Sequence, residues 1–403
     1  MSKIPDNTDL LQQLMDNIED NIFFKDRDGK FIMINKANAK WFGVDDPQEI
    51  VGKDDFDFFD EKHALKQVEE EQWIMQTGKP VLGEAQASTH GGHIGWGSVT
   101  KIPLRDKDGQ IIGTMGIGRD ITELKTKELE LKMAHEQMLE DLRLAAKLQQ
   151  TFLPQSYPSF VDADNRSLIQ FHHFYEADVD LGGDFCSVHR LSDTKAGLLI
   201  CDVMGHGVRA ALVTGIIHAF AEELAQQADS PGDLLTALNQ RLVHVLQTEE
   251  EYLFATAAYC TIDLESGELA LAIAGHTLPF LIQPQSGDVS QLTIAEAISG
   301  PALAVIADYS YESTCTQLRP GDEVLMYTDG ICEALNSSRD EFGVEHLQET
   351  IQDFNTLPLA ELFSRIVEAV QDYAGSKKLG DDVCLLGFTL NSLRTIESEI
   401  GRN

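Results

Sequence analysis

The chain has 403 residues, of which 43% are hydrophobic and 24% are charged, so it is long enough for two or three domains with buried cores. Acidic residues outnumber basic residues by 66 to 31, which gives a formal net charge of −35. Phosphate backbones and anionic lipid surfaces repel such a chain, so the charge argues against binding to nucleic acid and to membrane surfaces.

All six cysteines lie after residue 180, and none forms a Cys-x-x-Cys pair. This spacing predicts neither a zinc site nor a disulfide framework, and it fits a reducing compartment. The first residues lack the basic and apolar regions of a secretion signal, and no apolar run approaches the roughly 20 residues that cross a bilayer. The sequence therefore predicts a cytoplasmic protein without a membrane segment.

Residues 8–120 mix short helical and strand-like patterns. Asp-Gly turns at Asp28-Gly29 and Asp108-Gly109 each precede a β-type run, at 31–35 and at 111–117. Asp-Gly turns beside such runs are typical of β-hairpins. We therefore expect a first domain with an antiparallel sheet and helices.

Residues 121–153 contain neither glycine nor proline and are rich in Glu, Lys, Leu, Gln and Ala. Apolar residues recur there at spacings built from three- and four-residue steps: Ile121, Leu124, Leu131, Met138, Leu142, Ala145 and Phe152. Glu128, His135 and Gln149 interrupt this stripe. The pattern predicts one long helix with a weak coiled-coil seam, suited to a signalling helix that can shift register. A helix packed along its own domain is the alternative.

Residues 155–390 combine β-type runs with helical stretches. The β-type runs lie at 196–201, 256–262, 269–274, 323–327 and 383–388, and the helical stretches lie at 208–226, 231–248, 344–354 and 358–373. This order differs from the regular strand–helix alternation of a parallel sheet, so an α+β domain is expected.

Four aspartates in short turns stand out in this third zone. Asp202, Asp329 and Asp381 directly follow or precede apolar runs, as expected at the ends of buried strands, while Asp184 has a less regular setting. Carboxylate oxygens are the ligands that Mg²⁺ and Mn²⁺ prefer, so their convergence predicts a divalent metal site. Taken singly, each also has an ordinary explanation as a turn residue, a helix N-cap or a loop charge.

A series of short strings in this zone stands in the order found in one enzyme family. The strings are Leu153-Pro154, Gly182-Gly183-Asp184, Asp202-Val203-Met204-Gly205-His206-Gly207 with Ala210-Ala211, Ala274-Gly275-His276, Leu318-Arg319-Pro320-Gly321-Asp322, Tyr327-Thr328-Asp329-Gly330, Glu333-Ala334, Phe342-Gly343 and Asp381-Asp382. Together they resemble the PPM-type, metal-dependent (type 2C) serine/threonine phosphatases, and most closely their bacterial branch related to stage II sporulation protein E. The resemblance implies an α-β-β-α sandwich over residues 155–390.

In that family, a hydroxide held by two Mn²⁺ or Mg²⁺ ions attacks the phosphorus of phosphoserine or phosphothreonine, because the ions lower the pKa of water and neutralise the phosphoryl oxygens. Carried over to this sequence, the resemblance implies that Asp202 bridges both ions and that the carbonyl of Val203 completes one shell. It assigns Asp329 and Asp381 to one ion and Asp184 to the other. Asp202 and Asp184 are therefore the expected catalytic residues.

The sequence departs from the family at several positions. His206 follows Asp202 more distantly than the histidine often assigned as general acid, so a structural or supporting role is favoured for it. Ser187 stands where the family often has an acid, which leaves the ligand set intact. Asp382 is expected to be a neighbour of the site, and His276 a turn or core histidine.

Residues 8–122 resemble a PAS sensor domain, and Gly118-Arg119-Asp120-Ile121-Thr122 resembles the junction between such a domain and its output helix. Cysteine is absent before Cys186, which excludes the flavin photochemistry of light-sensing relatives and leaves the PAS ligand open. The resemblance thus implies a PAS domain at 8–120, a coiled-coil helix at 121–153 and a phosphatase domain at 155–390.

This arrangement resembles PAS–helix–phosphatase regulators of sigma-factor partner switching. It implies an enzyme, homodimeric through the PAS domain and the helix, that removes phosphate from Ser or Thr of a STAS-type anti-sigma-factor antagonist. Two alternatives stay open: a catalytically silent regulator that binds the same partner, and a phosphatase that acts on a small phosphorylated molecule.

Overall fold

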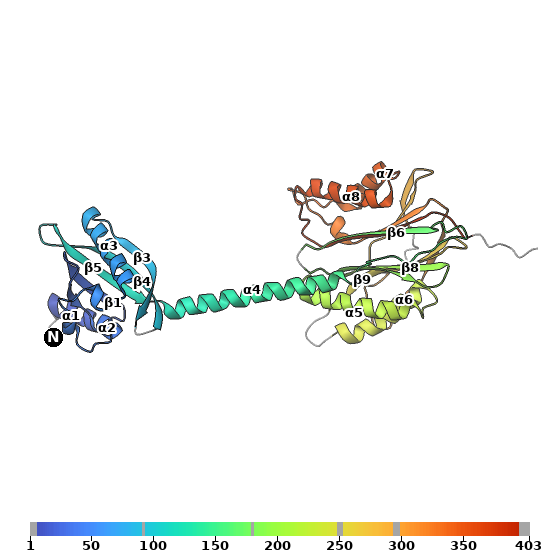
Figure 1. Cartoon of the computed structure of the whole chain (residues 1–403). Coiled ribbons are helices and arrows are strands. Elements are labelled where there is room, and N and C mark those ends of the chain that lie inside the picture. Colours follow the sequence, from blue (N-terminus) through green and yellow to red (C-terminus); the bar gives the residue numbers. More distant parts are fainter. Residues whose placement is uncertain (1–5, 91–92, 179–180, 248–252, 293–298, 395–403) are drawn as a thin grey trace, which may run out of the picture. The chain divides into compact units, whose positions relative to one another are not determined.

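The computed structural model describes residues 6–90, 93–178, 181–247, 253–292 and 299–394 (Figure 1). The chain forms two compact units, Met1–Gln137 and Met138–Asn403, and the division falls inside helix α4 (Thr122–Gln150). None of the described helices combines the length and the hydropathy needed to span a membrane.

The N-terminal unit is an antiparallel sheet flanked by helices, as expected. Its five strands lie in the order β2-β1-β5-β4-β3. In chain order the elements are α1 (Asn7–Asn17), β1 (Asn21–Asp26), β2 (Phe31–Ile34), α2 (Lys36–Trp41), the 3-10 helices η1 (Pro47–Glu49) and η2 (Asp55–Asp57), α3 (Glu61–Thr77), β3 (Val81–His90), β4 (His93–Arg105) and β5 (Ile111–Asp120).

Both predicted hairpins are present in this sheet. Asp26 Oδ1 accepts two backbone N–H bonds across the β1–β2 turn at 2.9 Å each, and Gly29 adopts a φ of +77°, which residues with a Cβ rarely take. Asp106 and Gly109 repeat this arrangement between β4 and β5. The local turn chemistry therefore sets the register of both strand pairs.

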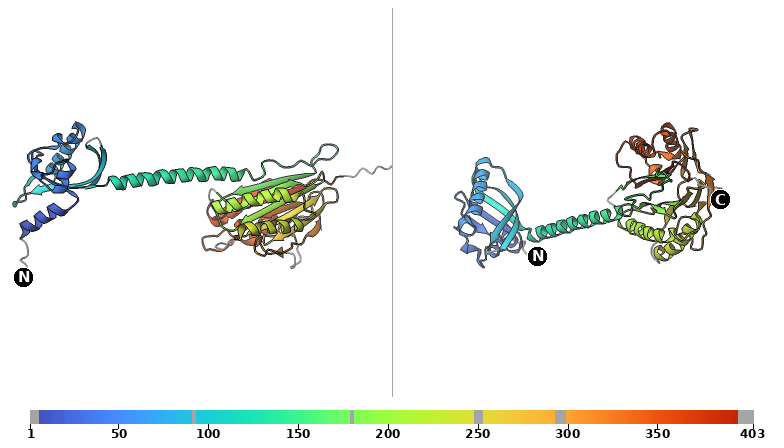
Figure 2. Two further views of the ribbon diagram at one scale, coloured as in Figure 1. Left: turned by 90° about the horizontal axis from the view of Figure 1, so that it is seen from below. Right: turned by 45° about the vertical axis from the view of Figure 1, so that its right-hand side comes forward.

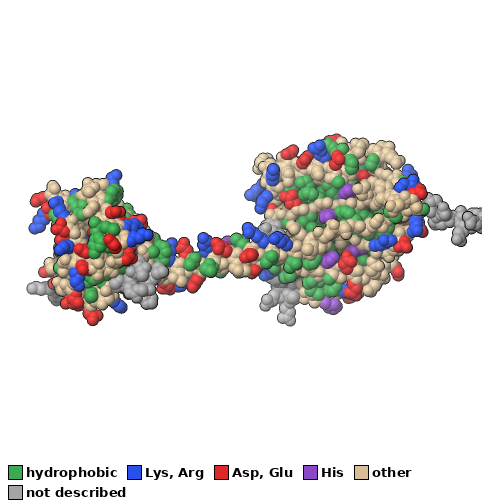
Figure 3. Space-filling model, in the orientation of Figure 1, with side chains coloured by type: hydrophobic (Ala, Val, Ile, Leu, Met, Phe, Trp, Pro, Cys, Tyr) green, Lys and Arg blue, Asp and Glu red, His purple; other side chains and the backbone are tan. Residues whose placement is uncertain are grey.

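Helix α4 confirms the predicted long helix. Leu124, Leu131 and Met138, which are spaced by seven residues on the predicted seam, are exposed on its surface. Figure 3 shows apolar side chains interspersed with acidic and basic ones along the helix. The helix thus presents an apolar seam, while the coiled coil itself stays a prediction.

Two sheets stacked face to face, with helices on both outer faces, form the C-terminal unit (Figures 1 and 2). One sheet has the order β13-β10-β9-β8-β7, with β14 paired to β10, and the other has the order β12-β11-β15-β16-β6. Helices α5 and α6 pack on the first sheet, and α7 and α8 pack on the second. The expected α-β-β-α sandwich is confirmed.

The elements of this unit are β6 (Ile169–Glu176), β7 (Asp184–Arg190), β8 (Lys195–Val203), α5 (Val208–Ala225), α6 (Pro231–Leu246), β9 (Ala255–Asp263), β10 (Glu268–Ala274), β11 (Phe280–Gln283), β12 (Asp288–Gln291), β13 (Ser299–Gly300), β14 (Thr314–Gln317), β15 (Glu323–Tyr327), the 3-10 helix η3 (Asp329–Ile331), α7 (Gly343–Phe354), α8 (Leu359–Ala374) and β16 (Val383–Leu390). The five predicted strands correspond to β8, β9, β10, β15 and β16, and the four predicted helices to α5–α8. The predicted end of the second helix, residue 248, lies outside the described residues.

Three apolar clusters hold these layers together. The cluster between the sheets includes Ile200, Met326 and Phe388, all almost completely buried. The other two lie between each sheet and its helices. All six cysteines are free, and every one except Cys315 is buried, as expected for small core residues. Burial of apolar surface on both faces of each sheet therefore fixes where the strand ends lie.

Candidate active site

Strand ends from both sheets bring the predicted aspartates together. Asp184 begins β7 and Asp202 lies near the end of β8, and the two residues are direct partners in the antiparallel register. Asp329 follows β15 and Asp381 precedes β16, which are paired strands of the other sheet. Thr328 Oγ1 donates a hydrogen bond to Asp184 Oδ2 at 2.6 Å and thereby joins the two sheets at this point.

Burial and mutual repulsion raise the pKa of three of these carboxyl groups. Asp184 is 3% exposed, and burial followed by the charge of Asp202 raises its pKa well above the usual value. Burial, followed by the charges of Asp329 and Asp381, raises the pKa of Asp202 to about 7. Burial and then the charge of Asp381 raise the pKa of Asp329. Acids gathered in this way favour a bound cation, because its charge offsets their repulsion.

The carbonyl of Val203, the fifth predicted ligand, lies near the carboxylate of Asp202. A Cβ built on Gly183 would lie 2.5 Å from Val203 O and 3.3 Å from Asp202 Oδ1, so glycine is required for this close approach. The backbone N–H of Val203 also donates to Gly183 O at 3.1 Å. The Gly182-Gly183-Asp184 loop therefore packs closely against the end of β8, near the carbonyl oxygen of Val203 and Oδ1 of Asp202.

No group of three or more His, Cys, Asp or Glu side chains among the described residues already has the geometry of a metal site. Mutual repulsion keeps ionised carboxylates apart until a bound cation offsets their charge. Mg²⁺ in addition keeps several water ligands and needs few direct protein ligands. The donor set of four carboxylates and a carbonyl therefore fits a hard divalent cation such as Mg²⁺ or Mn²⁺.

Thr328 and Asp382 support the site, although the sequence did not reveal their contacts. Thr328 is fully buried, and its hydroxyl also accepts the backbone N–H of Cys384 at 2.9 Å. Asp382 Oδ2 accepts the backbone N–H of Gly183 at 2.6 Å. Both residues adjoin predicted ligands in the strings Tyr-Thr-Asp-Gly and Asp-Asp, which is the only signal that the sequence offers.

The two histidines singled out from the sequence have different surroundings. His206 is exposed in the loop after Asp202, whereas His276 is buried. His276 Nδ1 lies 2.7 Å from Thr256 Oγ1, and Thr256 is the register partner of Asp202 on β9. Burial lowers the pKa of His276 to about 4, so this histidine is neutral at physiological pH.

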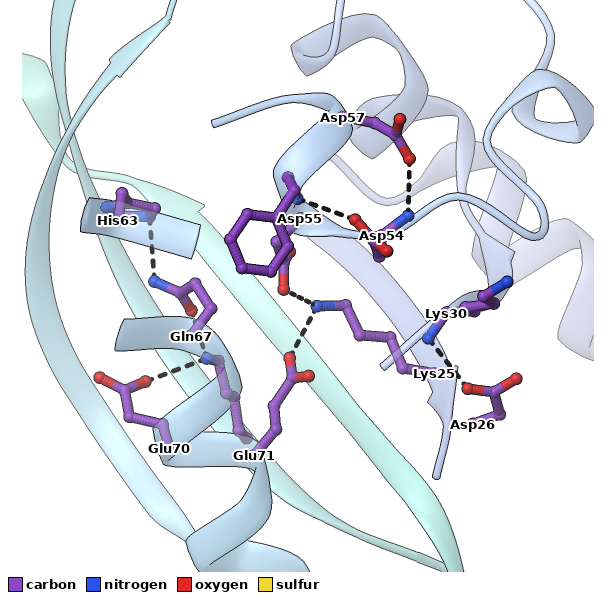
Figure 4. Close-up of polar contacts among 12 residues, drawn as sticks. Lys25, Asp26, Lys30, Asp54, Asp55, Asp57, His63, Gln67, Glu70 and Glu71 are labelled. Atoms are coloured by element: carbon purple, nitrogen blue, oxygen red, sulfur yellow. Dashed lines mark hydrogen bonds and ion pairs between the residues drawn. The ribbon is translucent and has the colours of Figure 1, made fainter. Parts of the chain in front are cut away.

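The N-terminal unit contains a separate cavity of about 110 Å³, bordered by aromatic rings and by a buried ionic network. Lys25 is 2% exposed, and its ammonium group lies between the carboxylates of Asp55 and Glu71, with 2.7 Å to Glu71 Oε1 (Figure 4). Trp96 and Thr122 line the same cavity. Thr122 Oγ1 accepts a hydrogen bond of 2.8 Å from the backbone N–H of Trp96 where α4 begins. The cavity therefore adjoins both the ionic network and the first residue of the long helix.

Comparison with known proteins assigns both units. A family model described as stage II sporulation protein E matches residues 192–391. The C-terminal domain belongs to the stage II sporulation protein E family. A second family model, described as PAS fold, matches residues 15–126, so this stage II sporulation protein E domain follows a PAS domain. The resemblance noted from the sequence is confirmed.

Two curated relatives of this family come from Bacillus subtilis (strain 168). Phosphoserine phosphatase RsbP is 27% identical over 247 residues, which cover 61% of this chain and 57% of RsbP. Phosphoserine phosphatase RsbU is 25% identical over 263 residues, which cover 64% of this chain and 72% of RsbU. The chain thus spans little more than half the length of RsbP.

A solved structure shows the same fold for the C-terminal unit. The SiaA-PP2C domain of Pseudomonas aeruginosa superposes with a TM-score of 0.53 at 21% sequence identity. The match covers 64% of this chain and 98% of that domain. The sandwich of the stage II sporulation protein E domain is therefore a PP2C fold.

Proposed function

We propose that this chain is a metal-dependent protein phosphatase that hydrolyses phosphoserine or phosphothreonine under the control of its PAS domain. The observation that carries the proposal is the pairing of Asp184 with Asp202 across β7 and β8, next to Asp329 and Asp381 of the other sheet. Family membership and the two relatives named phosphoserine phosphatases support the same activity.

In this proposal Asp202 would be shared by two Mn²⁺ or Mg²⁺ ions, and the carbonyl of Val203 would add a ligand to one of them. Asp329 and Asp381 would hold one ion, and Asp184 would hold the other. Ions bound there would lower the pKa of water at neutral pH and would offset the charge of the phosphoryl oxygens. No side-chain nucleophile is then needed.

Neighbouring residues hold the carboxylate of Asp184 and the backbone of its loop in place. Thr328 fixes Oδ2 of Asp184 through a 2.6 Å hydrogen bond, and Asp382 fixes the peptide N–H of Gly183. Asp184 is buried, while Asp381 is exposed, so we expect the phosphorylated residue to approach from the side of Asp381. Fixed oxygens cost little reorganisation during the reaction, which is the usual source of electrostatic catalysis.

The substrate that we propose is a phosphorylated STAS-domain protein of the anti-sigma-factor antagonist type. The support is the resemblance to partner-switching regulators, together with the two phosphoserine phosphatases among the relatives. We further propose that α4 pairs with the same helix of a second copy through the exposed seam of Leu124, Leu131 and Met138. A signal received at the PAS cavity would reach the catalytic domain through this helix.

Release of inorganic phosphate from a phosphorylated STAS protein tests the proposal. The full chain is assayed with Mn²⁺, with excess EDTA, and as the variants Asp202→Asn and Asp353→Asn. Metal assistance is worth several kcal/mol, so Asp202→Asn should lower turnover on the order of 10³-fold. Asp353 is exposed on α7 and serves as the matched control, which should keep full activity.

The same assay separates the alternatives. Mn²⁺-dependent hydrolysis of para-nitrophenyl phosphate without hydrolysis of any phosphoprotein would favour a small-molecule phosphatase. Absence of Mn²⁺-dependent phosphate release from both substrates would favour a catalytically silent regulator and contradict the proposal.

A further inference from the structure

The last turn of α4 reaches the loop that carries Asp184. Gln149 interrupts the apolar stripe of this helix, yet it is only 8% exposed. Its Nε2 donates to Gly182 O at 2.6 Å and to Thr214 Oγ1 of α5 at 3.1 Å, and its Oε1 accepts the N–H of Gly182 at 3.2 Å. One side-chain amide therefore binds both backbone polar groups of Gly182.

Other partners hold the same loop. Asp382 Oδ2 accepts the N–H of Gly183 at 2.6 Å, and Gly183 O accepts the N–H of Val203 at 3.1 Å. A Cβ on Gly182 would collide with the hydroxyl of Tyr175 and would lie 2.6 Å from Asp382 Oδ2. The loop is thus fixed by strand β8, by Asp382 just before β16 and by α4, and among these contacts of the described residues the one with α4 comes from outside the sandwich.

Packing anchors the end of α4 beside this contact. The ring of Phe152 stacks on the ring of His218 with a centroid distance of 5.3 Å, and Phe152 also packs closely on Gly215 of α5. An apolar residue at position 149 would satisfy such packing, whereas burying an amide costs free energy unless it is hydrogen-bonded. The amide of Gln149 therefore adds what packing cannot, namely directional bonds to one peptide of the Asp184 loop.

We propose that Gln149 is a positioning residue that holds the Gly182–Asp184 loop where Asp184 can take part in metal binding; this inference rests on the proposed metal-dependent function. Because a helix turns by about 100° per residue, even a one-residue shift of α4 relative to the sandwich would carry the amide away from Gly182. A change of register in α4 would then act on the metal centre through the contact between Gln149 and Gly182.

The test compares Gln149→Met, which keeps the length but removes the hydrogen bonds, with Gln149→Glu, which keeps an acceptor for the Gly182 N–H. Gln150→Met is the matched control, because Gln150 is the next residue of α4 and is exposed. Hydrogen exchange of the backbone amides of residues 182–184 is measured in the metal-free full chain. Mn²⁺ affinity is measured by calorimetry.

Gln149→Met should speed exchange at residues 182–184 while leaving the amides of β15 and β16 protected, and should weaken Mn²⁺ binding roughly tenfold. Gln149→Glu should fall between this variant and the natural chain, and Gln150→Met should match the natural chain. In phosphatase assays, excess Mn²⁺ should restore the turnover of Gln149→Met. Loss of turnover that excess Mn²⁺ does not restore would contradict a role in metal positioning.

Unchanged exchange at residues 183–184 together with unchanged Mn²⁺ affinity in Gln149→Met would overturn the inference and leave Gln149 a packing residue. These two readouts need no substrate, so they separate this inference from the proposed activity. A chain that binds Mn²⁺ through Gln149-dependent positioning but hydrolyses no phosphoprotein would overturn the proposed function alone. A chain that binds no Mn²⁺ would overturn both.

Discussion

Removing the hydroxyl of Thr328 should lower the free energy of unfolding of the C-terminal unit, and the two hydrogen bonds of this hydroxyl set the size of the loss. The hydroxyl is fully buried, donates to Asp184 Oδ2 at 2.6 Å and accepts the N–H of Cys384 at 2.9 Å. In Thr328→Val the shape is kept but both bonds are lost. A hydrogen bond to a charged group contributes about 1.5–3 kcal/mol, and an unpaired buried N–H costs about 1–3 kcal/mol. The added methyl group offsets part of this, so we expect the free energy of unfolding to fall by about 3 kcal/mol.

Urea unfolding of the metal-free full chain measures this loss. The three tryptophans, Trp41, Trp73 and Trp96, all lie in the N-terminal unit, so tryptophan fluorescence reports that unit while circular dichroism reports both. The fluorescence transition should not move. Thr328→Ser keeps the hydroxyl and should lose only about 1 kcal/mol for its missing methyl group. A Thr328→Val variant as stable as Thr328→Ser would show that the two hydrogen bonds of the hydroxyl do not stabilise the C-terminal unit.

Three further perturbations have defined outcomes. Asp202→Asn should raise the free energy of unfolding of the metal-free C-terminal unit by about 1 kcal/mol, because one repelling carboxylate is removed; thermal unfolding in excess EDTA measures this, and a destabilised variant would argue against the repulsion. Burial lowers the pKa of His276 from 6.5 to about 4. As the pH falls, this histidine is therefore protonated in the unfolded chain before it is protonated in the folded chain. The contribution of His276 to stability is therefore full above pH 6.5 and falls by about 3 kcal/mol as the pH drops to 4, and His276→Gln should remove this contribution from the pH dependence of urea unfolding. Lys25→Met leaves Asp55 and Glu71 as buried acids without their cation and should cost about 3–5 kcal/mol by tryptophan fluorescence; adding Asp55→Asn and Glu71→Gln should recover most of it, and an undiminished loss in the triple variant would show that charge is not the cause.

The sequence predicts strands well where both faces are apolar and poorly where buried side chains are polar. Strands β8, β9, β10, β15 and β16 were all identified from their apolar runs. Strands β6 and β7 were missed, and both lie at the end of a strand order, where a sheet edge tolerates polar residues. In β7, His189 Nε2 lies 3.4 Å from Glu222 Oε1 of α5, and in β6, His173 Nδ1 lies 2.6 Å from the hydroxyl of Tyr157. These partners are brought near by the tertiary structure, so the sequence pattern of the strand itself does not predict them.

The site shows the same division between local and distant information. The four aspartates could be singled out because a site for a hard divalent cation would need that residue type at strand ends. Thr328 and Gln149 could not, because their partners Asp184 and Gly182 lie 144 and 33 residues away in the chain. Gln149 even counted as an interruption of the helical stripe, although the structure gives it three hydrogen bonds.

Calorimetric titration of the metal-free full chain with Mn²⁺ tests most directly whether the four aspartates form a metal centre. Two Mn²⁺ ions should bind per chain, as a two-metal hydrolytic site requires, and Asp202→Asn should lose at least one of them. Asp353→Asn should bind both ions as the natural chain does. A natural chain that binds no Mn²⁺, or an Asp202→Asn chain that binds two ions with unchanged affinity, would contradict the account.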